Sequence, residues 1–252
     1  DGANVTINGS VGTNAKLRFN GGPTVNGNVE FNGSGSGWQT VPSGATYNVV
    51  YNSTDVTFPT VESLASQEFS GGLSWLASNN DNSLANPPIT GNAISISGGA
   101  NETLVGKAGG ANYYLTSLVC SGSSQVIFDN SAGPITIWFG PSGGTGSFTF
   151  NGGTAAVKMS QNPADPVKIN IAASSSINFN GNNELDALVY DINNAAQGSV
   201  TMNGSPEVYG SLITQAFKLN GGPTVNYIPN LTPGSQIDYY GFVDSWNEVN
   251  PL

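Results

Sequence analysis

The stretch that decides the fold is VTINGSVGTNAKLRFNGGPTVNGNVEFNG, residues 5–33. Within it an asparagine returns every six residues, and short runs of alternating apolar and polar residues fill the intervals. A six-residue period is typical of parallel β-helices, in which each short strand must turn a corner before the next begins. Asparagine and glycine tolerate the left-handed backbone conformation that a tight corner requires. The asparagines of this period are Asn8, Asn14, Asn20, Asn26 and Asn32.

The same corner motif, an apolar residue followed by Asn-Gly, returns in the second half of the chain. Asn-Gly between strands is also the strongest signal for a β-hairpin. Six-residue steps leave little room for two hairpin arms, so we predict a parallel β-helix, and the rule for parallel crossovers makes it right-handed. Asparagines at equivalent corners can then hydrogen-bond along the axis. The later corner asparagines are Asn151, Asn180, Asn203 and Asn220.

A longer copy links the two ends of the sequence. Residues 19–26, FNGGPTVN, match residues 219–226, LNGGPTVN, at every position but the first. In a solenoid, equal sequences are expected to occupy equivalent places in different rungs. We therefore expect equivalent rungs near both ends; a docking element present twice is the alternative.

The pattern divides a single all-β domain, residues 1–252, into four parts. Residues 1–58 form a first strand block, 92–228 the main solenoid block, and 229–252 a C-terminal strand and tail. Residues 59–91 lose the pattern: apolar residues follow Thr60 at helical spacing until Gly71-Gly72 would end the helix. We predict a partly helical insertion that covers an open end or a side face of the solenoid.

Composition excludes several functions. The net charge is −10 and the six basic residues are scattered, whereas a nucleic acid or an anionic membrane needs clustered Lys and Arg. We expect neither partner and no membrane span in this chain. Histidine, the commonest metal ligand and proton shuttle, is absent. Cys120 is the only cysteine and is expected to be buried.

Carboxylates are the remaining candidates for catalysis, because enzymes that degrade polysaccharides share this fold class. The best local group is Glu184, Asp186 and Asp191. Strand alternation places the first two on one face and Asp191 on the other, and a solvated surface is the favoured interpretation. We predict no catalytic, cofactor or metal site, and keep a carbohydrate-active enzyme as the third hypothesis.

Exposed aromatic side chains would offer a contact surface for glycans or for a protein partner. Flat threonine-rich faces can bind ice, but Thr-x-Thr does not recur at a fixed rung interval here. The candidate contact aromatics are Trp38, Trp75, Trp138, Tyr239, Tyr240 and Trp246.

A family resemblance rests on six short runs in a fixed order: VTINGSVG (5–12), YYL (113–115), ITIWF (135–139), VYGSLI (208–213), KLNGG (218–222) and VDSW (243–246). On these runs the chain resembles the β-solenoid domains of pilus-associated bacterial surface proteins, the PilX-like relatives of minor pilins. The resemblance covers most of the chain apart from the insertion and implies a surface or fibre role without catalytic residues. Such relatives carry a hydrophobic N-terminal helix, which this sequence does not include; we expect that it was cleaved off or that this form is secreted.

Together these observations predict a secreted or cell-surface structural protein, a rigid subunit of a pilus or another extracellular filament. Its expected partners are copies of itself or other pilus and surface proteins, and no cofactor is expected. A glycan-binding adhesin that uses the aromatic side chains is the second hypothesis.

Overall fold

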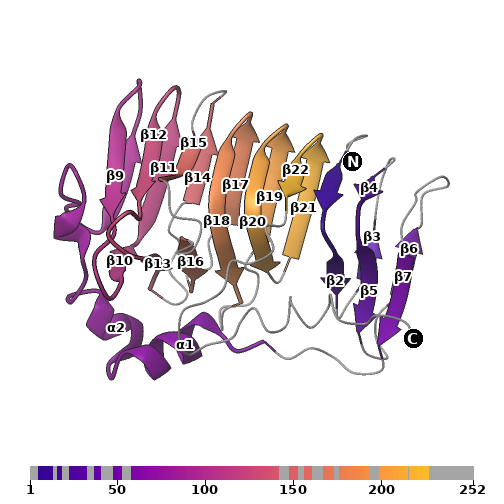
Figure 1. The fold of residues 1–252 in the computed structure, drawn as a ribbon, viewed down its shortest axis with the longest axis horizontal. Helices are drawn as coiled ribbons and strands as arrows, with labels where there is room; N and C mark the ends of the chain where they lie inside the picture. The colour runs from indigo at the N-terminus through magenta and orange to yellow at the C-terminus, as the bar shows by residue number, and fades with distance from the viewer. Residues whose placement is uncertain are drawn as a thin grey trace.

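The computed structural model describes residues 5–13, 16–18, 23–32, 37–40, 48–52, 58–141, 148–152, 156–160, 167–172, 176–192, 199–214 and 216–226. Over these residues the chain forms a parallel β-helix, in which strands of successive rungs lie side by side on three faces (Figure 1). All the pairs between its strands are parallel. The predicted all-β solenoid is confirmed, and the hairpin interpretation is wrong because hairpin arms pair antiparallel.

Face I is the longest continuous row of strands. Each of its strands pairs with the next in the row. In order along the axis they are β9 (Asn101–Val105), β12 (Gln125–Asp129), β15 (Ala156–Ser160), the first half of β18 (Glu184–Asp191), the first half of β20 (Glu207–Thr214), β22 (Thr224–Asn226), β1 (Thr6–Asn8) and β4 (Thr24–Val25).

Faces II and III complete the prism. Face II consists of β10 (Ala111–Leu115), β13 (Ile135–Phe139), β16 (Lys168–Ile171) and the second halves of β18 and β20. Face III consists of β8 (Ala93–Ile96), β11 (Ser117–Ser121), β14 (Phe148–Asn151), β17 (Ser176–Gly181), β19 (Ser199–Gly204) and β21 (Ala216–Gly221). The N-terminal rungs add two small sheets: β2 (Val11–Thr13), β5 (Asn28–Asn32) and β7 (Asn48–Asn52) in one, and β3 (Lys16–Arg18) with β6 (Gly37–Thr40) in the other.

The rungs do not stack in the order of the sequence. β22, the last described strand, pairs with β1, and β1 in turn pairs with β4. Thr6 therefore lies between Thr224 and Thr24 in the same register. The strands of the two GGPTVN copies thus occupy equivalent places and flank β1 from both sides.

The six-residue period corresponds to one face of the solenoid. Thr6 pairs with Thr24, eighteen residues further on, so one rung of this part takes three steps of six. In most of the main block the rungs are longer, and Leu118 pairs with Phe148, for example; the last rung is again short, since Ser199 pairs with Ala216.

In most strands whose side chains the structure describes, alternate residues point into an apolar core, as the period of two requires. In the middle of face III the core is aromatic: Phe148, Phe150 and Phe179 are buried, and Phe150 stacks on Phe179 with ring centroids 5.4 Å apart. Cys120 is buried in the same core as a free thiol.

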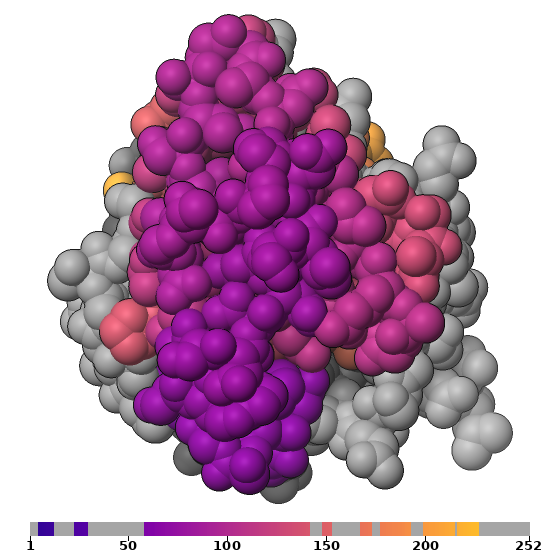
Figure 2. Space-filling model, turned by 90° about the vertical axis from the view of Figure 1, so that its left-hand side faces the viewer, coloured from indigo at the N-terminus to yellow at the C-terminus, as the bar shows by residue number. Residues whose placement is uncertain are grey.

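The insertion forms α1 (Val61–Glu68), α2 (Gly72–Leu76) and the short 3-10 helix η1 (Asn82–Leu84). The Thr60 hydroxyl accepts a hydrogen bond from the Ser63 backbone N–H, 3.3 Å, and so caps α1. The buried face of the helices packs on aromatic side chains of face II, including Tyr114, Trp138 and Tyr190. Figure 2 looks onto the end with the first rung, where purple residues of the insertion spread across the molecule.

Candidate functional site

The first rung is covered by polar contacts from the insertion. The side-chain N–H₂ of Asn82 donates to the Tyr114 carbonyl, 2.8 Å, and its carbonyl accepts from the Tyr114 N–H, 3.1 Å. Asn82 therefore satisfies the edge of β10 as a further strand would. On face I, Asn86 pairs with Thr103 of β9 in an antiparallel bridge.

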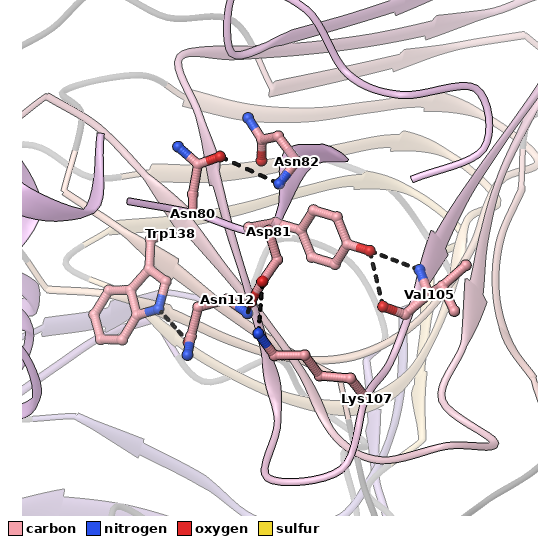
Figure 3. A network of polar contacts seen from close by, with 8 residues as sticks. Asn80, Asp81, Asn82, Val105, Lys107, Asn112 and Trp138 are labelled. Atoms are coloured by element: carbon pink, nitrogen blue, oxygen red, sulfur yellow. Dashed lines mark hydrogen bonds and ion pairs between the residues drawn. The ribbon is translucent and has the colours of Figure 1, made fainter. Parts of the chain in front are cut away.

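A second cluster holds the same segment in place (Figure 3). The Asp81 carboxylate binds the Lys107 ammonium at 2.6 Å and accepts from the Asn112 backbone N–H at 2.8 Å. The indole N–H of Trp138 donates to the Asn112 side chain, 3.1 Å. These contacts pair the polar groups of the cluster with one another and hold the segment against the first rung.

Among the described segments, the helices lie on face II, and no helix lies on face I or face III. The outer side of face I is acidic in its middle, where Glu184 lies beside Glu207 and Asp186 beside Tyr209. Tyr209 donates its hydroxyl proton to the Glu207 carboxylate at 2.8 Å, which raises the pKa of the tyrosine. Asp191 is buried on face II, where Thr214 contacts its carboxylate at 3.1 Å. The structure thus separates Asp191 from Glu184 and Asp186.

The strands of face III contain no acidic residue. Their outward side chains form rows along the axis, because the paired residues lie in register. The central row runs across the whole face and consists of Ser95, Val119, Thr149, Asn178, Thr201 and Lys218. Sequence reasoning missed this row, although a signal exists: from β14 onward, each member stands two residues before a corner asparagine.

The corner asparagines of face III form a hydrogen-bonded ladder. Asn180 donates to Asn151 at 2.6 Å, Asn203 to Asn180 at 2.7 Å, and Asn220 to Asn203 at 2.8 Å. Each link uses one N–H and one acceptor lone pair, whereas an amide has two of each. The ladder therefore fixes the amides of Asn180 and Asn203 and leaves each of them one N–H and one lone pair beyond its two ladder bonds.

A second ladder lies at the end of face I in the N-terminal rungs. Asn8 donates to Asn226 at 2.7 Å, and Asn26 donates to Asn8 at 2.7 Å. The corner motif therefore occupies more than one edge of the prism. Of the other predicted corners, Asn14 and Asn20 lie outside the described residues, and Asn32 ends β5 with its side chain outside them.

The backbone at these corners differs from the expectation in one respect. The glycine after the asparagine takes the left-handed conformation, with φ of +107° at Gly181, +91° at Gly204 and +94° at Gly221. The corner asparagines Asn180, Asn203 and Asn220 remain in their strands. The glycine is also required by space, since a Cβ on Gly204 would lie 2.9 Å from the Gly181 carbonyl oxygen.

Of the predicted contact aromatics, the structure describes the side chains of Trp75 and Trp138. Trp138 is 1% exposed under the insertion, so it offers no contact surface, and that interpretation is wrong. Trp75 is 43% exposed and stacks on Phe69 with ring centroids 5.5 Å apart. The side chain of Trp38, in β6, lies outside the described residues, as do Tyr239, Tyr240 and Trp246.

Burial favours the neutral forms of Cys120 and Glu102. Burial raises the pKa of the Cys120 thiol to about 11, which leaves it protonated and unreactive at neutral pH. The Glu102 side chain points into the core from β9, and burial raises the pKa of its carboxyl. Over the described residues no group of His, Cys, Asp and Glu is placed to hold a metal ion. Within the same ranges, none of the helices has the length and apolar character needed to cross a membrane.

Comparisons with known proteins give two matches. A family model described as a domain of unknown function (DUF7305) matches residues 143–233, from the middle of face III to just beyond β22. A solved structure of a glycosylated ice-binding protein from an Arctic yeast is similar at 16% sequence identity, with 94% of both chains covered and a TM-score of 0.37. No curated protein matches the chain. Neither match tests the resemblance to pilus-associated solenoids, which stays a prediction.

Proposed function

We propose that this chain is a rigid structural module of an extracellular or cell-surface assembly, such as a pilus or another filament. The observation that supports it most strongly is the continuous row of parallel strands from β9 to β4 on face I. Strands about 4.8 Å apart, with every rung bonded to its neighbours, make a stiff prism. Seven such spacings give a length of about 34 Å, so the module is a short spacer.

The contacts of the insertion with the first rung limit how such a module could assemble. Asn82 occupies the edge of β10 and Asn86 occupies the edge of β9, so another copy cannot add strands to these two edges of the first rung. Head-to-tail growth that stacks whole rungs is therefore blocked at this end, and contacts with other subunits lie on the flanks or at the opposite end. The proposal gives the module no catalytic role.

Electron microscopy of the purified protein over a range of concentrations tests the assembly. We expect single short prisms at low concentration and particles joined by their flanks or by the end opposite the cap at high concentration. Strictly monomeric particles throughout, or fibres joined at the first rung, would contradict the filament role. A depolymerisation assay on acidic polysaccharides tests the absence of catalysis.

A further inference from the structure

Face III differs in charge from the rest of the molecule. The chain carries a net charge of −10, yet the strands of face III contain no acid, and Lys218 at one end is their sole charged residue. A polyanion would meet one cation there, and a polycation would favour the carboxylates of face I. By charge, face III fits a neutral partner.

The face is also fixed in its geometry. Thr149, Asn178 and Thr201 lie in direct register on adjacent strands, and the adjoining asparagine ladder locks a second row. The backbone beneath both rows is bonded into a sheet, with buried phenylalanines behind it. Side chains held in this way lose little conformational entropy on binding.

The rows form a two-dimensional array. Adjacent strands place equivalent side chains about 4.8 Å apart, and the two rows lie about 6.6 Å apart along the strands. Hydroxyl and amide groups dominate the array, and both can donate and accept hydrogen bonds. Such an array suits a ligand that is itself flat, repeating and rich in hydroxyl groups.

A second copy of the chain suits this face poorly. Six strands of about five residues cover roughly 400 Å², about half of what each partner contributes to a specific protein interface. The central row also lacks the Trp, Tyr and Arg anchors on which such interfaces depend.

We propose that face III binds the surface of a neutral polysaccharide whose chains are packed side by side. The ladder amides of Asn180 and Asn203 would exchange hydrogen bonds with sugar hydroxyls, and Thr149 and Thr201 would add hydroxyl groups in the neighbouring row. Ice is a different flat and neutral surface, and it is favoured less because methyl groups occur in the central row only at Val119, Thr149 and Thr201.

Binding to microcrystalline cellulose and chitin powders tests this assignment. The wild-type protein is expected to sediment with at least one powder, and about 0.5 M NaCl is expected to leave binding unchanged, because a neutral ligand involves no screened charge pairs. The double variant Thr149→Glu/Thr201→Glu places two charges on face III. Losing hydrogen bonds worth about 1.4 kcal/mol in total would already weaken binding about tenfold, and desolvating the new carboxylates adds to this.

The matched control is Thr6→Glu/Thr103→Glu, which makes the same substitutions at strand threonines of face I. It is expected to bind as the wild type does, and equal melting temperatures of the two variants exclude a folding defect. If the face III variant is unstable, the double variant Thr149→Ala/Thr201→Ala serves as the milder change at the same row.

Three results would overturn the proposal: no sedimentation with either powder, equal loss in both variants, or enrichment of the wild type in growing ice without binding to either powder. The last result would assign the face to ice. Particle shape in electron microscopy is independent of all three, so the structural role is tested separately.

Discussion

At the scale of single residues, the asparagine and the glycine of the corner motif have different roles. The asparagine remains in the strand and bonds to its equivalent on the next rung, while the glycine takes the positive φ that turns the chain. Both residue types tolerate the left-handed conformation, so the sequence could not say which of them would adopt it. The structure decides it, because a carbonyl oxygen of the neighbouring rung leaves no room for a Cβ at Gly204.

The ladder predicts that Asn203 contributes measurably to the free energy of unfolding. Asn203→Ala removes the bond to Asn180 and the bond from Asn220, and we expect the free energy of unfolding to fall by about 1–3 kcal/mol for two partly buried hydrogen bonds. Urea denaturation measures it. Thr201→Ala, on the same strand and face, is the control; an equal loss in both variants would mean that the ladder adds nothing.

The buried carboxyl of Glu102 predicts a dependence of stability on pH. One of its oxygens is buried without a hydrogen-bond partner, and burial raises its pKa in the folded state. The folded state then binds the proton more tightly than the unfolded state does. This contribution to stability is complete below the pKa of the unfolded chain, about 4.3, and is lost as the pH rises through the folded pKa.

Glu102→Gln should therefore lose less stability than the wild type between about pH 4 and about pH 7, since glutamine does not ionise. Urea denaturation at both pH values measures the difference. Asn101→Gln, at the exposed start of the same strand, changes no ionisable group and is the control; it should keep the wild-type dependence on pH. An unchanged dependence in Glu102→Gln would contradict the prediction.

At the scale of elements, the insertion is a cover for the solenoid. Helical spacing from Val61 and the stop at Gly71-Gly72 indicated short helices, and α1 and α2 occupy these positions. The place of the insertion could not be deduced in the same way. The helices pack on face II because Tyr114, Trp138 and Tyr190 form an apolar outer surface there, and the segment after them pairs with the first rung.

The cap contact predicts a strong effect at Asn82. Asn82→Ala leaves the buried N–H and carbonyl of Tyr114 without partners, and we expect a loss of about 2–4 kcal/mol of unfolding free energy. The exposed edge of β10 should also promote association, visible as light scattering on heating. Asn79→Ala, at an exposed helix end, is the control. A variant with unchanged stability and no scattering would show that the cap is dispensable.

At the scale of the whole molecule, the N-terminal rungs close the far side of the main block. The contact between the two blocks runs through β22 and β1, which lie more than two hundred residues apart in the chain. The copy at residues 19–26 and 219–226 indicated equivalent rungs, and the described strands of both copies do lie in equivalent places.

This arrangement predicts a specific crosslink. In the double variant Thr6→Cys/Thr224→Cys the thiols lie on adjacent strands, whereas in Thr24→Cys/Thr224→Cys they lie about 9.6 Å apart, two strands away. A short bifunctional thiol reagent should link the first pair within one chain and faster than the second, while the buried Cys120 does not react. Intact mass and gel mobility measure the products. Crosslinked dimers that persist on dilution would place the contact between two chains.

The sequence by itself determined the class of fold, because a six-residue period with glycine at the corners suits short parallel strands and little else. It also indicated that corner asparagines form ladders, since the Asn-Gly motif marks equivalent corners of the rungs even where the rungs differ in length. Only the tertiary structure decided the order of the rungs, the burial of Trp138 and the contrast between an acidic face I and an acid-free face III. These features depend on contacts between segments that are distant in the sequence. The alternation of residues along a strand distinguishes inward from outward side chains, but it does not predict which outer face another element will cover.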